Sequence, residues 1–258
     1  MNNVFAVAGV VIKELYRRKD FYVLFILTIL ICLIMASVNI FNDDKIVRYL
    51  KELCLLLIWI SSLVIAITTT ARQIPAEREQ RTLLPLLAKP LSRNQLILGK
   101  FLGCWLACGL VLLCFYAFFA ALSASREHQL PVLDYVQAAA MHWFMLGVVV
   151  AIALLGSLVF AAPSSNSTIC FVIVGGILFV GRHLDQVAMT LPEPARGIVL
   201  GLYFAIPHLE LFDMRDLVIH NWPLIEWKYV GLAIVYAIAY SAVFLTAACL
   251  VFRRKAVN

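Results

Sequence analysis

Long apolar stretches separated by short polar segments dominate the pattern of this chain. A helix needs roughly 20 predominantly apolar residues to cross a bilayer. Five stretches meet that requirement, at about 21–41, 53–70, 101–122, 136–162 and 229–252. A sixth stretch, 169–181, is short enough to be re-entrant instead of spanning. We therefore expect an all-α polytopic membrane protein with six transmembrane helices.

Residues 1–19 follow a different period from the long apolar stretches. Apolar side chains recur there every three or four residues, as on one face of an amphipathic helix. The opposite face is charged and consists of Lys13, Glu14, Arg17 and Arg18. Because a membrane span follows directly, we expect this helix to lie in the interface, with its apolar face toward the acyl chains and its cations at lipid phosphates.

Composition and charge support a membrane domain and indicate its orientation. Hydrophobic residues make up 63% of the chain and charged residues 14%, whereas about a quarter of a soluble domain is charged. With six spans and both termini in the cytoplasm, the inner segments hold 13 Lys and Arg residues and the outer ones 8. This excess agrees with the positive-inside rule. One transmembrane domain, residues 1–258, is the simplest description.

The polar segment 72–100 is expected in the cytoplasm, between the second and third spans. Thr82 can cap a short apolar helix, and Pro90 ends it. The pattern Ser-x-x-Gln at residues 92–95 is a capping box, which starts a second helix that continues into the third span. The segment therefore predicts a short surface helix, parallel to the membrane and rigidly joined to a transmembrane helix.

Two interpretations of segment 72–100 are open from its residues. A cytoplasmic partner could bind its leucine face and a charged rim, and so tilt the second and third spans together. This rim consists of Glu77, Arg78, Glu79 and Arg81. Alternatively, the leucines dip into lipid and the arginines bind headgroups, which would make the segment a membrane-bound loop.

The segment 182–228 is the largest piece expected outside the membrane on the far side. Its four prolines exclude one long helix, and the apolar stretch 195–206 between them suits a half-buried or re-entrant helix. Trp222 and Trp227 are expected at the headgroup level, where the chain re-enters the membrane. On the cytoplasmic side, Arg93 and Lys100 either hold the third span at the headgroup layer or contact a cytoplasmic partner.

The sequence has no motif for catalysis or metal binding. Gly99-Lys100 is followed by Phe101 and is not a P-loop that cradles ATP, and H-E-x-x-H does not occur. We expect the five His residues at span ends or in outer segments, and the seven Cys as packing residues. The chain should therefore hold no catalytic residue, metal or cofactor. The few polar side chains within the spans suit an apolar or amphipathic cargo.

The segment 72–100 resembles the signature region of permease subunits of ABC-2 type exporters. There, an acidic stretch leads into T-L-x-x-L-L, a proline, S-R and G-K. The matching residues here are Glu77, Glu79, Thr82, Leu83, Leu86, Leu87, Pro90, Ser92, Arg93, Gly99 and Lys100. Residues 13–19 are similar to the amphipathic connecting helix of the family. Pro85 and Lys89 are compatible with the pattern but are not required by it.

The resemblance implies a half-transporter of a bacterial inner membrane that works by ATP-driven alternating access. Two permeases, identical or homologous, would pair with two separate ATPases that carry ATP and Mg²⁺, without nucleic acid. The implied ATPase-coupling residues are Glu77, Glu79, Arg81, Thr82, Leu83, Leu86, Leu87 and Pro90. A membrane scaffold that recruits a cytoplasmic protein without transport is the alternative, and an intramembrane enzyme is a third.

Overall fold

The computed structural model describes residues 3–17, 19–37, 43–79, 92–127 and 131–254, and these ranges contain no β-strand. The helices in chain order are α1 (Asn3–Tyr16), α2 (Lys19–Ser37), α3 (Asp43–Ala71), α4 (Pro75–Glu79), α6 (Arg93–Glu127), α7 (Val132–Val159), α8 (Pro163–Thr190), α9 (Ala195–Ala205), the 3-10 helix η1 (Leu209–Phe212), α10 (Arg215–Ile219) and α11 (Trp227–Arg254). The predicted all-α fold is confirmed.

Among the residues that the structure describes, six helical segments are long and apolar enough to cross a membrane. They are Arg48–Glu79, Arg93–Ser125, Val132–Val159, Pro163–Gly181, Ala195–Ile219 and Trp227–Arg254. The first predicted span corresponds to α2, whose apolar part Tyr22–Ile34 is shorter. The predicted short stretch 169–181 lies inside α8, which is a continuous helix of 28 residues. It is longer than its apolar pattern because polar residues at both ends remain helical.

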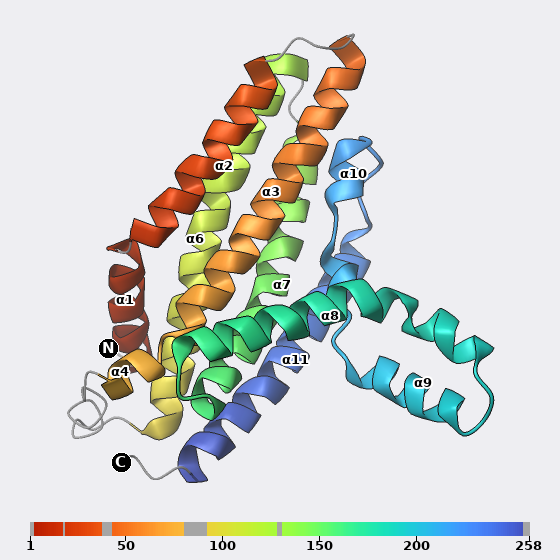
Figure 1. Cartoon of the computed structure of the whole chain (residues 1–258). Coiled ribbons are helices and arrows are strands. Elements are labelled where there is room, and N and C mark those ends of the chain that lie inside the picture. The colour runs from red at the N-terminus through yellow and green to blue at the C-terminus, as the bar shows by residue number, and fades with distance from the viewer. Residues whose placement is uncertain (1–2, 18, 38–42, 80–91, 128–130, 255–258) are drawn as a thin grey trace.

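The helices α3, α6 and α7 pack against one another, with α2 beside α3 and α11 against α7 (Figure 1). α7 is the central helix of the bundle. In the most apolar part of α7, 72% of the residues are buried inside the protein, whereas in that of α11 only 22% are buried. Both chain ends lie at the end of the bundle where α3 and α4 stop and α6 begins (Figure 1). The start of α1, the end of α11 and the described flanks of segment 80–91 thus lie at the same end of the bundle. The orientation of this end toward the cytoplasm stays a prediction.

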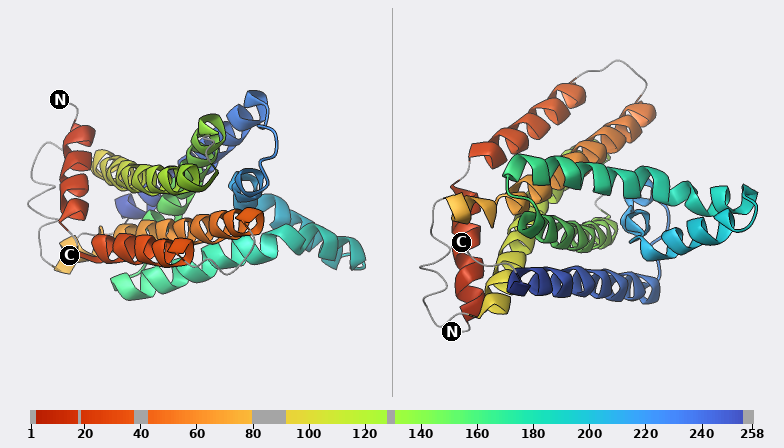
Figure 2. Two further views of the ribbon diagram at one scale, coloured as in Figure 1. Left: turned by 90° about the horizontal axis from the view of Figure 1, so that it is seen from above. Right: turned by 60° about the horizontal axis from the view of Figure 1, so that its bottom comes forward.

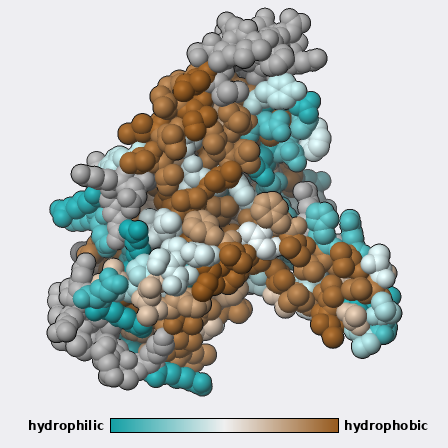
Figure 3. Space-filling view, viewed as in Figure 1, coloured by the Kyte–Doolittle hydropathy of each residue, from teal (hydrophilic) through white to brown (hydrophobic). Residues whose placement is uncertain are grey.

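The helices α8 and α9 form a hairpin arm that leads away from the bundle (Figures 1 and 2). No residue of α9 is buried, and the arm exposes Phe179, Ile198 and Phe204 by 72% or more. Apolar surface covers this arm and also α2 in the space-filling view (Figure 3). Lipid or a second subunit must cover so much apolar surface, because water does not solvate it favourably.

A reciprocal pair of tryptophans joins α6 to α7. The motif W-x-x-x-G occurs once in each helix, as Trp105 with Gly109 and as Trp143 with Gly147. The two indole rings stack with centroids 4.6 Å apart, and each indole N–H donates to the backbone carbonyl of the other tryptophan at 3.0 Å. A Cβ at Gly109 would lie 2.6 Å from Nε1 of Trp143, so the glycine makes room for the ring.

A buried polar pair joins α3 to α7. His142 is only 3% exposed, and its Nε2 lies 2.8 Å from Oγ of Ser62. The position of His142 near a span end stays a prediction, whereas its hydrogen-bond partner comes from α3, 80 residues earlier in the chain. A polar group can be buried within a span when a neighbouring helix supplies its hydrogen bond, and Ser62 does so here.

Candidate functional site

The helix α6 begins at the capping box that its sequence predicts. The backbone N–H of Ser92 donates to Oε1 of Gln95 at 3.0 Å, and the N–H of Gln95 donates to Oγ of Ser92 at 3.2 Å. The next residue, Arg93, donates through Nη1 to the carbonyls of Phe252 and Arg253 at 3.0 and 3.2 Å. These are among the last carbonyls of α11, which lack helical partners. Arg93 thus ties the start of α6 to the end of α11.

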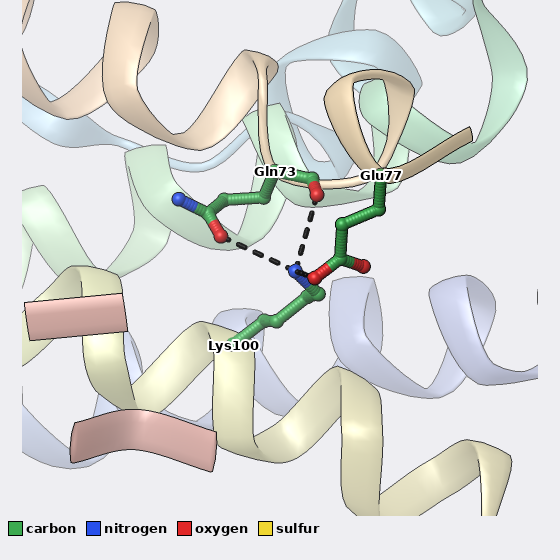
Figure 4. Close-up of polar contacts among 3 residues, drawn as sticks. All are labelled: Gln73, Glu77 and Lys100. Atoms are coloured by element: carbon green, nitrogen blue, oxygen red, sulfur yellow. Dashed lines mark hydrogen bonds and ion pairs between the residues drawn. The ribbon is translucent and has the colours of Figure 1, made fainter. Parts of the chain in front are cut away.

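A buried lysine joins α6 to the end of α3. Nζ of Lys100 donates to the carbonyl oxygen of Gln73 at 3.1 Å, to Oε1 of Gln73 at 3.3 Å and to Oε1 of Glu77 at 2.8 Å (Figure 4). The Lys100 side chain is 2% exposed and that of Glu77 22%. We call Gln73, Glu77 and Lys100 the latch. Three acceptors, one of them charged, compensate for the burial of the ammonium group.

A second contact holds the end of α3 from the side of α8. Asn166 is fully buried. Its Nδ2 donates to the carbonyl of Ala71 at 3.4 Å and to that of Ala153 in α7 at 3.1 Å. Its Oδ1 accepts from Sγ of Cys170 at 3.3 Å. Gly156 leaves the space that this amide occupies. The end of α3 is therefore bound to α6 through Lys100 and to α8 through Asn166. Asn166 also connects it to α7.

The helix α1 packs on α6 along a seam of two glycines. Gly99 and Gly103 are four residues apart, the G-x-x-x-G spacing that lets two helices approach closely. A Cβ at Gly99 would lie 2.7 Å from Cβ of Val7, and one at Gly103 would lie 2.7 Å from Cβ of Val11 and 3.0 Å from Cα of Ala8. Because Lys100 sits between the two glycines, one turn of α6 binds both α1 and the end of α3.

The comparison with known families decides the identity of this arrangement. The family of ABC-2 family transporter proteins matches residues 10–257, nearly the whole chain. The chain belongs to this family. No curated protein matches the sequence. Membership in this family makes the chain a membrane permease of an ABC transporter and an integral membrane protein. Permeases of this family work with a partner ABC ATPase subunit.

Only two of the predicted coupling residues lie among the residues that the structure describes. Glu79, the last residue of α4, is exposed, and Glu77 is engaged in the latch. The other predicted coupling residues lie outside the described residues: Arg81, Thr82, Leu83, Leu86, Leu87 and Pro90. Their role stays a prediction. The described part of the loop is thus its beginning, up to Glu79, and its end, from Ser92.

Two predicted headgroup anchors have other partners in the permease. Lys100 is buried in the latch, so the headgroup role predicted for it is wrong. Position within one turn of the span end suggested an anchor, but Gln73 and Glu77 fold back over the ammonium group. Arg93 binds the end of α11 instead of standing alone at the surface. Trp222 and Trp227 are 53% and 58% exposed, and their anchoring role stays a prediction.

The amphipathic helix of the permease is present as α1, but its apolar face has a different neighbour from the predicted one. Val7, Ala8 and Val11 are buried and face the glycine seam of α6, whereas the prediction placed this face against acyl chains. The apolar Phe5 and Val10 are 62% and 66% exposed. Lys13, Glu14 and Arg17 are exposed, and the side chain of Arg18 lies outside the described residues.

Sequence reasoning missed Gln73, Asn166 and the glycine seam. The seam carried a usable signal, because G-x-x-x-G in an apolar segment is a known helix-contact pattern. The amide side chains of Gln73 and Asn166 carried a weaker sequence signal. Lys100 bonds to a residue 27 positions earlier, and Asn166 to one 95 positions earlier. Neither partnership follows from local spacing.

We expect Gly103→Val to weaken the attachment of α1 to α6. The new methyl groups would meet the backbone of Ala8, which cannot move aside as a flexible side chain can. Overpacking of this kind costs about 1–3 kcal/mol, so thermal unfolding in detergent should shift downward. Gly231→Val in α11 is the matched control, because a Cβ there meets nothing within 4 Å. Equal melting curves for the two variants would contradict the seam.

Proposed function

We propose that the permease is half of an ATP-driven exporter of an apolar or amphipathic, lipid-like cargo in a bacterial inner membrane. Two copies, or two homologous permeases, would work with two copies of an ATPase. The element 82–87 would dock on the ATPase through Leu83, Leu86 and Leu87, with Glu79 and Arg81 as polar contacts. The latch carries this proposal, because it joins the beginning of the docking loop to a transmembrane helix.

The bonds around the latch support a defined path for movement. Glu77 in α4 and Gln73 at the end of α3 bind Lys100, and Gly99 and Gly103 on either side bind α1. A push on segment 80–91 would therefore move α3, α6 and α1 together. In our proposal this movement switches the cavity between the two permeases from inward to outward exposure.

The far end of α3 supports the second half of this mechanism. α3 has 29 residues, which is about 43 Å of helix. Near its beginning, Arg48 contacts His220 and Lys51 contacts Asn221, just after α10. Further along α3, the guanidinium of Arg215 stacks on the ring of Trp59, with its central carbon 4.7 Å from the ring centroid. Movement of α3 would thus reach the segment from Ala195 to Asp216, which we propose acts as the exit lid.

Purification of the tagged permease from native membranes tests the proposal. We expect an ATPase to co-purify and its turnover to respond to the permease. Glu79→Lys should reduce this response several-fold without unfolding the spans, because it reverses an exposed charge beside the docking element. Leu86→Asp should have a similar effect. Lys228→Glu, an exposed reversal at the start of α11, is the control.

Three results would contradict the exporter. Normal coupling in both Glu79→Lys and Leu86→Asp would remove the docking assignment. A stoichiometric partner without ATPase activity would instead support the scaffold alternative. Activity of the purified chain alone, lost with a single polar substitution in the spans, would support an enzyme.

A further inference from the structure

A tight turn ends α10 beside the beginning of α3. The N–H of His220 donates to the carbonyl of Asp216 at 3.0 Å, and the N–H of Trp222 donates to that of Leu217 at 3.0 Å. Asn221 has a φ of +51° between them. This is the pattern of a Schellman C-cap, in which asparagine tolerates the left-handed conformation. The turn therefore presents the side chains of His220 and Asn221 in a defined orientation.

Two cations of α3 hold this turn. Nη2 of Arg48 lies 2.6 Å from Nε2 of His220, and Nζ of Lys51 donates to Oδ1 of Asn221 at 3.1 Å. The Lys51 side chain is 1% exposed. The imidazole also stacks on Trp222, with ring centroids 5.0 Å apart. The two contacts are three residues apart on α3, so both come from one face of the helix. We call Arg48, Lys51, His220 and Asn221 the clamp.

The partners of His220 determine the protonation state of its ring. A guanidinium group only donates hydrogen bonds, so Nε2 must accept from Arg48 and carries no proton. Nδ1 lies 2.9 Å from the carbonyl oxygen of Asp216, which only accepts, so Nδ1 carries the proton. The ring is therefore neutral when the clamp is closed, with its tautomer assigned from these two neighbours.

We propose that His220 makes the clamp a proton-sensitive catch on the exit lid. A proton taken up from solvent at Nε2 would place an N–H donor opposite a second donor and a positive ring opposite the guanidinium of Arg48. The hydrogen bond is lost and repulsion replaces it, so the turn at the end of α10 loosens from α3. The placement of this clamp on the non-cytoplasmic side rests on the proposed function, but the chemistry of the contact does not.

Other charged groups on the packed helices modify this effect without reversing it. α10 packs against α3 and α7. α3 contributes the positive charges of Arg48 and Lys51 and the exposed carboxylate of Glu52. α7 contributes Asp134 near its start, and α10 itself carries the exposed Asp216. Solvent screens exposed carboxylates, so the directly bonded guanidinium has the largest influence. Arg215 is bound to Asp213 by two hydrogen bonds.

The direction of the pH effect follows from the neutral ring. The closed clamp requires an Nε2 atom without a proton, because Arg48 can only donate to it, so proton uptake at that atom favours opening. Acid on the lid side would then release the turn at residues 215–222. Because this segment joins the lid to α11 (Figure 1), release would loosen the lid without any movement of the ATPase.

Hydrogen exchange of the full-length permease in lipid nanodiscs tests the catch. Peptides that cover residues 215–222 are compared at pH 7.5 and 5.5, after correction for the intrinsic exchange rate. We expect protection to fall about 3- to 10-fold at the lower pH, the loss that a solvent-screened repulsion would cause. His220→Gln should abolish this change, because its amide oxygen still accepts from Arg48 but takes up no proton. His183→Gln, an exposed position on α8, should leave it intact.

A second variant keeps the proposal testable if His220→Gln does not fold. Arg48→Gln removes the guanidinium, so protonation of His220 no longer creates repulsion and the pH response should shrink. Equal protection of the wild-type turn at both pH values would overturn the catch, as would an unchanged response in His220→Gln or Arg48→Gln. The experiment contains no ATPase, so its outcome is independent of the docking test.

Discussion

Lys100→Glu is expected to disconnect the docking loop from the transmembrane helices. The substitution would place two carboxylates against each other where the latch now holds an ion pair of 2.8 Å. Removing one partner of a buried pair costs about 3–5 kcal/mol, and like charges add repulsion. We expect ATPase turnover to lose its response to the permease, as measured with the co-purified partner in nanodiscs.

A charge swap separates the latch from a general loss of stability. In Lys100→Glu combined with Glu77→Lys, the ion pair is restored in reverse, and we expect part of the coupling to return. Lys100→Met should have a smaller effect, since Glu77 is 22% exposed and can be solvated. Arg254→Glu, an exposed reversal at the same end of the bundle, is the control. A double variant as impaired as Lys100→Glu would argue against a paired role.

Loss of either stacked tryptophan is expected to destabilise the contact between α6 and α7. Trp143→Ala removes an indole that stacks on Trp105 and exchanges two hydrogen bonds with it. Lipid tails reduce the hydrophobic part of this cost, but the packing contacts and the cavity remain. We expect a loss of about 2–4 kcal/mol in the free energy of unfolding in detergent.

A double-mutant cycle measures the reciprocity of the tryptophan pair. If the rings act together, Trp105→Ala combined with Trp143→Ala should cost less than the sum of the two single substitutions, by about 0.5–3 kcal/mol. Trp227→Ala, at a ring that is 58% exposed, should change stability by about 0.5 kcal/mol or less. Strict additivity of the two single variants would show that the rings contribute separately.

Features that depend on local spacing were predicted well. The pattern Ser-x-x-Gln predicted the start of α6, and the structure has both hydrogen bonds of the capping box. The apolar stretch at 195–206 predicted a short helix, and α9 covers Ala195–Ala205. Capping and hydrophobic periodicity act over one or two turns, so residues that are neighbours in sequence determine them.

Features that depend on distant partners were predicted poorly. Lys100 was expected at the headgroups because it lies at a span end, yet it is buried and binds the end of α3. The bond of Arg93 to the end of α11 was not predicted either. Ser62, 80 positions before His142, supplies the hydrogen bond of its buried ring, and local spacing did not predict this partner. The cost of burying a polar side chain depends on whether a partner lies within about 3 Å, and local patterns contain no such information.

By itself, the sequence determined the class of this protein: hydrophobic length requires helices that cross a bilayer, and the residues around segment 72–100 indicate an ABC-2 permease. Tertiary structure alone decided how the two described ends of segment 72–100 are attached to the bundle. Helices that fold separately in lipid leave their polar groups to be satisfied by whichever helix packs beside them. Packing brings Gln73, Glu77 and Lys100 together at one end of α3 and His220 to Arg48 near the other.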